Sequence, residues 1–222
     1  MTEFRSKDTW TLFRIMAEFV EGFETLAPIF PAVSVFGGAR VARDSAIYQL
    51  GREIGRCLGR EGFAVITGGG PGAMEAANRG AHEVEAPSIG LNIKLPYEQH
   101  DNGYADTVIH FDYFFARKVM FVKYACAFVM LPGGFGTLDE MFECLTLKQT
   151  GKSRDTPVIL VGSSYWSGLL AWLESEVMKE GLIAAKDLKL FSVVDTAEDV
   201  CRLVREGWER RRKDLPPQEG PT

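Results

Sequence analysis

The stretch AFVMLPGGFGT, residues 127–137, decides the fold of this chain. It opens on an apolar run, Ala127–Leu131, of the kind typical of a short strand buried on both faces of a parallel sheet. A glycine-rich turn follows. Beyond it, Leu138, Met141, Phe142 and Leu145 recur at helical spacing, which predicts a helix over 136–150. We therefore expect a strand, a glycine loop and a helix in direct succession.

The same order occurs twice upstream. An apolar run at 32–36 leads through Gly37-Gly38-Ala39-Arg40 to a helical pattern at 44–61, and a run at 63–67 leads into Gly68-Gly69-Gly70-Pro71-Gly72. Further strands are predicted at 88–93, 107–110, 157–161 and 191–194, and further helices at 164–180 and 196–213. This alternation predicts an α/β, Rossmann-like open parallel sheet with helices on both faces, in one domain over 1–213.

Two segments flank this pattern. Residues 9–23 carry apolar side chains at helical spacing, which predicts an N-terminal amphipathic helix. That helix would pack on its own domain or form a contact between subunits. Residues 214–222 are Pro-rich and polar, and we expect a disordered tail.

Composition excludes several classes of function. A net charge of −5 argues against nucleic acid as a partner, and no apolar run reaches the roughly 18 residues of a membrane helix. The first ten residues lack a signal-peptide pattern, so we expect a cytoplasmic protein with no membrane contact. The four cysteines form no CxxC pair and are expected to be buried, reduced thiols. The three histidines share no metal-ligand spacing, so no metal is expected. We also expect no cofactor.

The three glycine loops predict a phosphate-bearing ligand. Glycine lets backbone N–H groups approach an anion, and each following helix adds the positive end of its dipole. In such sheets ligands bind beyond the carboxyl ends of the strands, where all three loops would meet. Residues 68–73 also fit a dinucleotide fingerprint, but the next strand ends in Asn92-Ile93-Lys94, without the acid that holds the ribose. No Walker lysine follows any of the loops.

Charged side chains surround the third loop. Glu140 and Glu143 share one face near the start of the helix over 136–150. A carboxylate beside a phosphate site is unfavourable unless it has a chemical task, and stabilising an oxocarbenium-like transition state is such a task. Arg117 and Lys118 precede this unit, and arginine binds phosphate through two parallel N–H donors. Helix capping by the acids and a solvated pair of cations are the simpler interpretations.

Three elements together resemble the LOG family, which is also called "lysine decarboxylase-like". PGGFGTLDE at 132–140 matches the family's PGGxGTxxE motif, Arg117-Lys118 matches its RK element, and GGGPGAME at 68–75 resembles its GGGxxGxM loop. The resemblance covers about half the chain. It implies a Rossmann-like phosphoribohydrolase that splits a cytokinin riboside 5′-monophosphate into an adenine-type base and ribose 5-phosphate.

The resemblance also implies roles for single residues. Arg117 and Glu140 would be catalytic, with the 5′-phosphate on the loop over Gly133–Thr137. The implied substrate-binding set is Lys118, Gly133, Gly134, Gly136, Thr137, Thr146, Gly69, Gly70 and Glu98. The ligand would be AMP or isopentenyl-AMP, and the protein a homodimer or a higher homo-oligomer. The N-terminal helix fits longer bacterial members of the family.

One departure concerns the substrate. Many family members carry His two residues before the Arg, where this chain has Phe115, so the choice of base stays open. The decarboxylase label finds no support, because no lysine stands in a recognisable pyridoxal-phosphate setting. Two other functions remain open on the same fold, namely a carrier of a nucleotide or of the molybdenum cofactor, and a nucleotide-sensing module.

The sequence predicts the following chemistry. The 5′-phosphate would accept hydrogen bonds from the N–H groups of Gly134, Gly136 and Thr137. Arg117 would hold the nucleotide, while Glu140 would stabilise the developing cation and orient the attacking water. The proton for the leaving base could come from Asp139, Glu143 or water.

Overall fold

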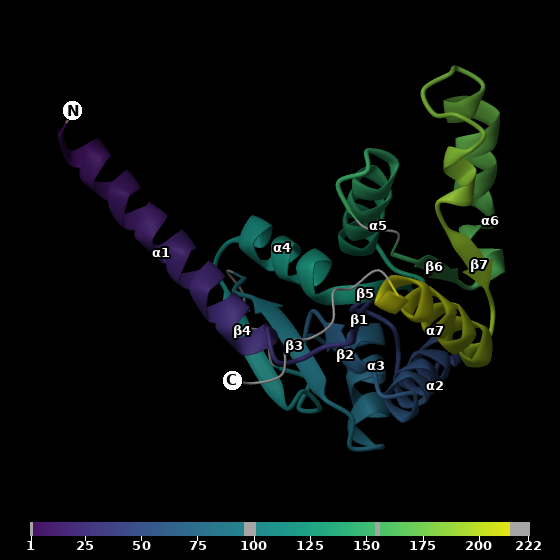
Figure 1. Cartoon of the computed structure of the whole chain (residues 1–222), viewed down its shortest axis with the longest axis horizontal. Helices are drawn as coiled ribbons and strands as arrows, with labels where there is room; N and C mark the ends of the chain where they lie inside the picture. The colour runs from purple at the N-terminus through teal and green to yellow at the C-terminus, as the bar shows by residue number, and fades with distance from the viewer. Residues whose placement is uncertain (1, 96–100, 154–155, 214–222) are drawn as a thin grey trace.

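A seven-stranded parallel sheet forms the centre of the computed structural model, which describes residues 2–95, 101–153 and 156–213 (Figure 1). The strands are β1 (Ala32–Phe36), β2 (Ala64–Thr67), β3 (Ser88–Ile93), β4 (Thr107–Phe111), β5 (Ala125–Met130), β6 (Val158–Val161) and β7 (Ser192–Val194). All seven predicted strands are present, with ends that differ from the prediction by at most two residues. The predicted fold class is confirmed.

The strand order β4-β3-β2-β1-β5-β6-β7 determines where a ligand can enter. The chain runs outward from β1 through β2 and β3 to β4, and then returns to place β5 on the other side of β1. The loops after β1 and β5 therefore leave the sheet in opposite directions and open a crevice between them. In doubly wound sheets this switch point is where ligands bind.

Helices cover both faces of the sheet, because successive residues of a buried strand point to opposite faces. Val33 and Val35 face a core shared with α2 (Ala46–Arg60), α3 (Ala73–His82) and α7 (Ala197–Lys213). Ala32 and Phe36 face the other core, which is covered by α1 (Thr2–Leu26), α4 (Phe114–Tyr124), α5 (Phe135–Gln149) and α6 (Ser163–Trp172). Helix α6 continues as a π-helical segment, η1 (Leu173–Met178), and a short 3-10 helix, η2 (Asp187–Lys189), precedes β7.

The first helix is longer than the predicted span of 9–23. Near its C-terminal end, Gly22 lies against Met120 of α4, and Leu26 is fully buried. Its earlier turns extend away from the sheet (Figure 1) and expose apolar side chains, among them Trp10, Phe13 and Met16. The helix therefore packs on its own domain at one end only. The predicted tail, 214–222, lies outside the described residues.

The expectation that all four cysteines are reduced thiols was wrong for one pair. Cys57 of α2 and Cys201 of α7 form a disulfide, with their Cα atoms 6.4 Å apart. The other two, Cys126 and Cys144, are free and buried, as expected. The sequence alone could not predict this pairing, because it depends on α2 and α7 lying side by side in the fold. Among the described helices, none has both the length and the apolarity needed to cross a membrane.

Candidate active site

The three glycine loops meet at the carboxyl edge of the sheet, as the sequence predicted. The N–H of Gly38 donates to Pro132 O at 3.0 Å, which joins the loop after β1 to the loop after β5. The N–H of Ala73 donates to Gly38 O at 3.0 Å, which joins the loop after β2 to the same point. Gly72 has φ +71° and lies so close to Gly38 O that a Cβ there would collide with the backbone. Glycine is therefore required at the junction.

A cleft of about 1020 Å³ opens above this junction. Backbone from the first and third loops forms much of its wall. Its ionisable side chains come from the loop after β1, from α4, from α5 and from α6. The lining residues are Phe36, Gly37, Gly38, Ala39, Arg40, Val41, Ala42, Ser45, Ile47, Gly68, Met74, Arg117, Phe121, Pro132, Gly133, Gly134, Phe135, Gly136, Thr137, Leu138, Glu140 and Tyr165.

The N-terminus of α5 forms one side of the cleft. Gly134 is the N-cap and has no side chain, so the first-turn N–H groups receive no side-chain cap from it. Phe135 and Gly136 begin the helix, and both line the cleft. The structure departs from the prediction at Thr137, whose N–H donates to Gly134 O at 3.0 Å within the turn. Its side chain is buried and packs beneath Gly133. The exposed end of the helix dipole is thus presented mainly by Gly134, Phe135 and Gly136.

Glu140 lies one turn further along α5 and lines the same cleft. Its side chain is buried, at 5% exposure, and its Oε2 has no hydrogen-bond partner among the described residues. Burial raises the pKa of Glu140 to about 7, an effect that Lys118 opposes and Glu143 reinforces. Near neutral pH this carboxyl therefore exists in both protonation states. Such a shift in a cleft is characteristic of a functional acid or base.

Arg117 of α4 also lines the cleft and is, with Glu140, one of the two residues that the resemblance implies to be catalytic. Its guanidinium lies over the rings of Phe121, at 5.3 Å, and Phe114, at 5.7 Å, and its Nε is buried without a hydrogen-bond partner among the described residues. Burial lowers the pKa of Arg117, and the nearby carboxylates of Glu140 and Asp139 offset this only in part. A cation whose Nε–H is shielded from solvent and unused favours an anionic partner. The cleft is where such a partner can bind.

Lys118 occupies a different position from the one that the resemblance implies. Its Nζ lies 2.9 Å from Asp139 Oδ2 and 2.7 Å from Glu143 Oε2, which ties α4 to α5 beside the cleft rather than lining it. Burial lowers the pKa of Lys118, but the hydrogen bonds that its ammonium donates to Glu143 and Asp139 outweigh this effect and raise the pKa. Lys118 thus contacts both carboxylates that flank Glu140 and offsets part of their charge.

Three other predicted residues do not line the cleft. Gly69 and Gly70 belong to the second loop, where their carbonyls accept from Asn102 at 3.0 and 3.2 Å, and only Gly68 of that glycine run reaches the cleft. Thr146 is exposed on α5, and its hydroxyl donates to Phe142 O at 2.7 Å. Glu98 lies outside the described residues.

Two ionisable residues of the cleft were not assigned a role from the sequence. Arg40 follows the glycines of the first loop, so its position in that loop already indicated that it would lie at the ligand-binding edge of the sheet. Tyr165 lies on α6, just beyond the carboxyl end of β6, and no motif marks it. Its only signal was its position after a strand, at the edge where ligands bind.

Fold and cleft together define a Rossmann-like α/β protein with a ligand cleft at the switch point of its sheet. Residues 74–204 match the protein family described as "Possible lysine decarboxylase". A Mycobacterium tuberculosis protein named cytokinin riboside 5′-monophosphate phosphoribohydrolase is 31% identical over 159 residues, covering 70% of this chain and 84% of the relative. Arabidopsis thaliana LOG3, of the same name, is 28% identical over 80% of this chain and 83% of its own length. The chain belongs to the LOG family.

Solved structures with a similar fold include carrier proteins. The molybdenum cofactor binding protein of Rippkaea orientalis superposes with a TM-score of 0.59 at 22% identity, covering 79% of this chain and 96% of that one. The molybdenum cofactor carrier protein of Chlamydomonas reinhardtii gives 0.57 at 23% identity over 81% and 98%. At this identity the likeness concerns the fold alone.

Proposed function

We propose that this chain hydrolyses the N-glycosidic bond of adenosine 5′-monophosphate, with or without a substituent on N6, to the free base and ribose 5-phosphate. One observation carries the proposal. Glu140 is buried and Arg117 is half-buried with its Nε shielded from solvent, each keeps a polar atom without a partner among the described residues, and both line the cleft formed by the glycine loops. A half-buried cation suits an anionic nucleotide, and a buried carboxylate suits a developing sugar cation. The names of the relatives support the same reaction.

The proposed substrate binds with its phosphate on the N-terminus of α5. The N–H groups of Gly134 and Gly136 donate to the phosphate, and the helix dipole favours its charge. Arg117 supplies N–H donors to the nucleotide and offsets its charge. This placement puts the ribose toward Glu140, one turn deeper along the helix.

Bond cleavage then follows from the position of Glu140. As the bond between C1′ and the base nitrogen lengthens, positive charge develops on the ribose, and the Glu140 carboxylate stabilises it. The same carboxylate accepts a proton from the water that attacks C1′. The oxygen of that water becomes the new hydroxyl of ribose 5-phosphate, and the base leaves with the bond electrons and takes up a proton.

The apolar wall of the cleft supports a purine as the leaving base. Phe36, Met74 and Phe121 line the cleft, and Phe135 stands at its mouth with 92% of its surface exposed. Aromatic and thioether side chains make favourable contacts with flat rings. Phe115, in contrast, packs against Tyr113 with ring centroids 5.5 Å apart and does not line the cleft.

The test is to incubate the pure protein with AMP and with isopentenyl-AMP and to separate the products by chromatography. Wild type should release free base and ribose 5-phosphate in equal amounts, and Glu140→Gln should release little of either. The ratio of the two rates would identify the preferred base. Tight binding of either nucleotide without any product would contradict hydrolysis and favour the carrier or sensing function instead.

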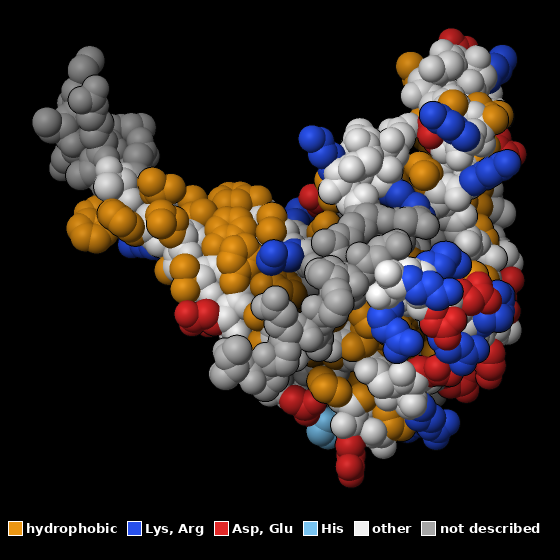
Figure 2. Space-filling model, viewed as in Figure 1, with side chains coloured by type: hydrophobic (Ala, Val, Ile, Leu, Met, Phe, Trp, Pro, Cys, Tyr) orange, Lys and Arg blue, Asp and Glu red, His pale blue; other side chains and the backbone are white. Residues whose placement is uncertain are grey.

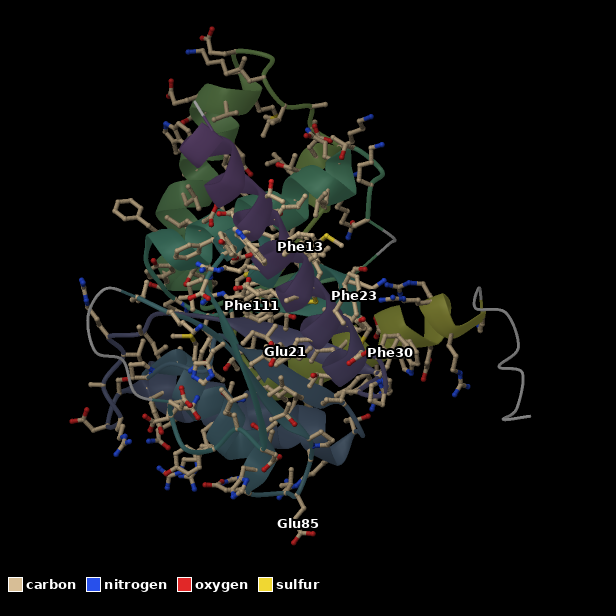
Figure 3. All side chains as sticks on the ribbon, turned by 90° about the vertical axis from the view of Figure 1, so that its left-hand side faces the viewer. Phe13, Glu21, Phe23, Phe30, Glu85 and Phe111 are labelled. Carbon is tan, nitrogen blue, oxygen red and sulfur yellow. A yellow bond between two sulfur atoms is a disulfide. The ribbon has the colours of Figure 1, made fainter. Side chains whose placement is uncertain are left out.

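We also propose that the protein is a homodimer or a higher homo-oligomer. Helices α1 and α4 expose a set of large apolar side chains, which Figure 2 shows as a band along α1, and Figure 3 places Phe13 and Phe23 on that helix. An apolar surface of this size usually marks an interaction site. Its members are Trp10, Leu12, Phe13, Met16, Val20, Phe23, Phe114, Phe115 and Val119. A second copy of the chain would cover it.

A further inference from the structure

Tyr165 of α6 reaches into the glycine loop after β5. Helix α6 begins directly after β6 because Gly162, its N-cap, has φ +97° and turns the chain. The ring of Tyr165 is held edge-on by Trp166, with centroids 4.9 Å apart. Trp166 is itself fixed, since it is buried and its Nε1 donates to Val161 O at 3.0 Å. The hydroxyl of Tyr165 is thus presented from a rigid support.

That hydroxyl donates a hydrogen bond to the carbonyl oxygen of Gly133. Gly133 O and the N–H of Gly134 belong to the same planar, trans peptide unit, so they point in opposite directions. Holding the carbonyl toward Tyr165 therefore directs the N–H of Gly134 away from it. A side chain on a different helix thus contributes to the orientation of one N–H donor at the start of α5.

The peptide between Gly133 and Gly134 needs such a restraint. Neither residue has a Cβ, so the steric barrier that keeps other peptides from rotating about the flanking bonds is low here. A rotated peptide would present the carbonyl dipole, with its negative end, to a bound phosphate. The single hydrogen bond from Tyr165 favours the orientation that presents the donor.

We infer that Tyr165 is a positioning residue that holds the Gly133–Gly134 peptide in the orientation needed to bind a phosphate monoester. The inference rests on the proposed function only in placing that phosphate at the start of α5. Tyr165 does not need to touch the reacting atoms. Its removal should weaken recognition of the phosphate and leave recognition of the base and ribose unchanged.

The experiment measures equilibrium binding of inorganic phosphate, AMP and adenosine with and without Tyr165→Phe, in both cases in a Glu140→Gln background so that AMP is not consumed. Phenylalanine keeps the ring contact with Trp166 and removes only the hydroxyl. We expect the affinities for phosphate and AMP to fall about 3- to 10-fold, the usual effect of one lost hydrogen bond. The affinity for adenosine should be unchanged. In turnover assays KM for AMP should rise by a similar factor while kcat changes less.

Tyr104→Phe is the matched control. Tyr104 lies between β3 and β4, its ring is under Arg79 at 5.5 Å, and it does not line the cleft. Its variant should bind all three ligands like wild type. Equal losses for AMP and adenosine in Tyr165→Phe, or wild-type affinity for phosphate, would overturn the inference. A wild-type protein that binds phosphate but releases no base would contradict the proposed hydrolysis and leave the inference about Tyr165 unaffected.

Discussion

Replacing Glu140 with Gln should have opposite effects on activity and on stability. Glutamine is nearly the same size and resembles the protonated acid, but it cannot carry negative charge or accept a proton from water. The proposed reaction needs the ionised carboxylate, so turnover should fall by about 10²- to 10⁴-fold. Binding of the phosphate should persist, because the donors at the start of α5 are unchanged.

The effect on stability follows from the pKa of Glu140. In the folded protein burial raises it from 4.5 to about 7, so the folded state holds this proton more tightly than the unfolded chain. The stabilisation from that proton is fully present below pH 4.5 and is lost as pH rises through about 7. Ionising the buried group then costs roughly 3 kcal/mol. Glutamine avoids this cost at every pH.

The assay is urea unfolding of both proteins near pH 5 and near pH 8. The free energy of unfolding of Glu140→Gln, relative to wild type, should increase by about 2 to 3 kcal/mol between these two conditions. Glu53→Gln, an exposed substitution on α2, is the control and should show no such change. A relative stability of Glu140→Gln that does not depend on pH would refute the reasoning about burial, and full turnover by that variant would refute its role in catalysis.

Four further outcomes follow from the same structure. In wild type, kcat/KM should rise with pH and level off above about 7, because the proposed reaction needs ionised Glu140 in the free enzyme. Arg117→Met should move that rise to higher pH, since Arg117 lowers the pKa of Glu140, and a pH profile of the variant would show this. The same variant should raise KM for AMP at least about tenfold. Gly55→Ala should destabilise the fold by about 1 to 3 kcal/mol in urea unfolding, because a Cβ there would collide with the backbone of Ala77 where α2 meets α3. Phe13→Ser should lower the molar mass measured by light scattering toward that of one chain, and an unchanged mass would remove this side chain from the proposed interface.

The sheet could be predicted because its signals are local. Each strand is a short apolar run closed by glycine, proline or a polar residue, and a buried parallel strand needs little else. The meeting of the three glycine loops followed from topology, since the carboxyl ends of parallel strands share one edge. Arg117 and Glu140 were recognised by the resemblance, and the structure brings both to the cleft at that edge.

The rest depended on contacts between distant segments. Lys118 sits beside Arg117 in sequence, but consecutive residues of a helix point in different directions, and it meets Asp139 and Glu143 instead of the cleft. The disulfide between Cys57 and Cys201 joins two helices that are 144 residues apart in the chain. Tyr165 reaches the third loop only because β6 lies next to β5. None of these pairings leaves a periodic or local pattern.

The contacts of α5 distinguish Glu140, the acid in the proposed reaction, from its two acidic neighbours. Asp139 and Glu143 both contact Lys118, so part of their charge is offset beside the cleft. Glu140, between them in sequence, is turned into the cleft and keeps an oxygen without a partner among the described residues. The burial that makes it costly to ionise also makes it a stronger base than an exposed carboxylate. A substrate that develops positive charge next to Glu140 would offset that cost in the transition state, which is the differential stabilisation that catalysis requires.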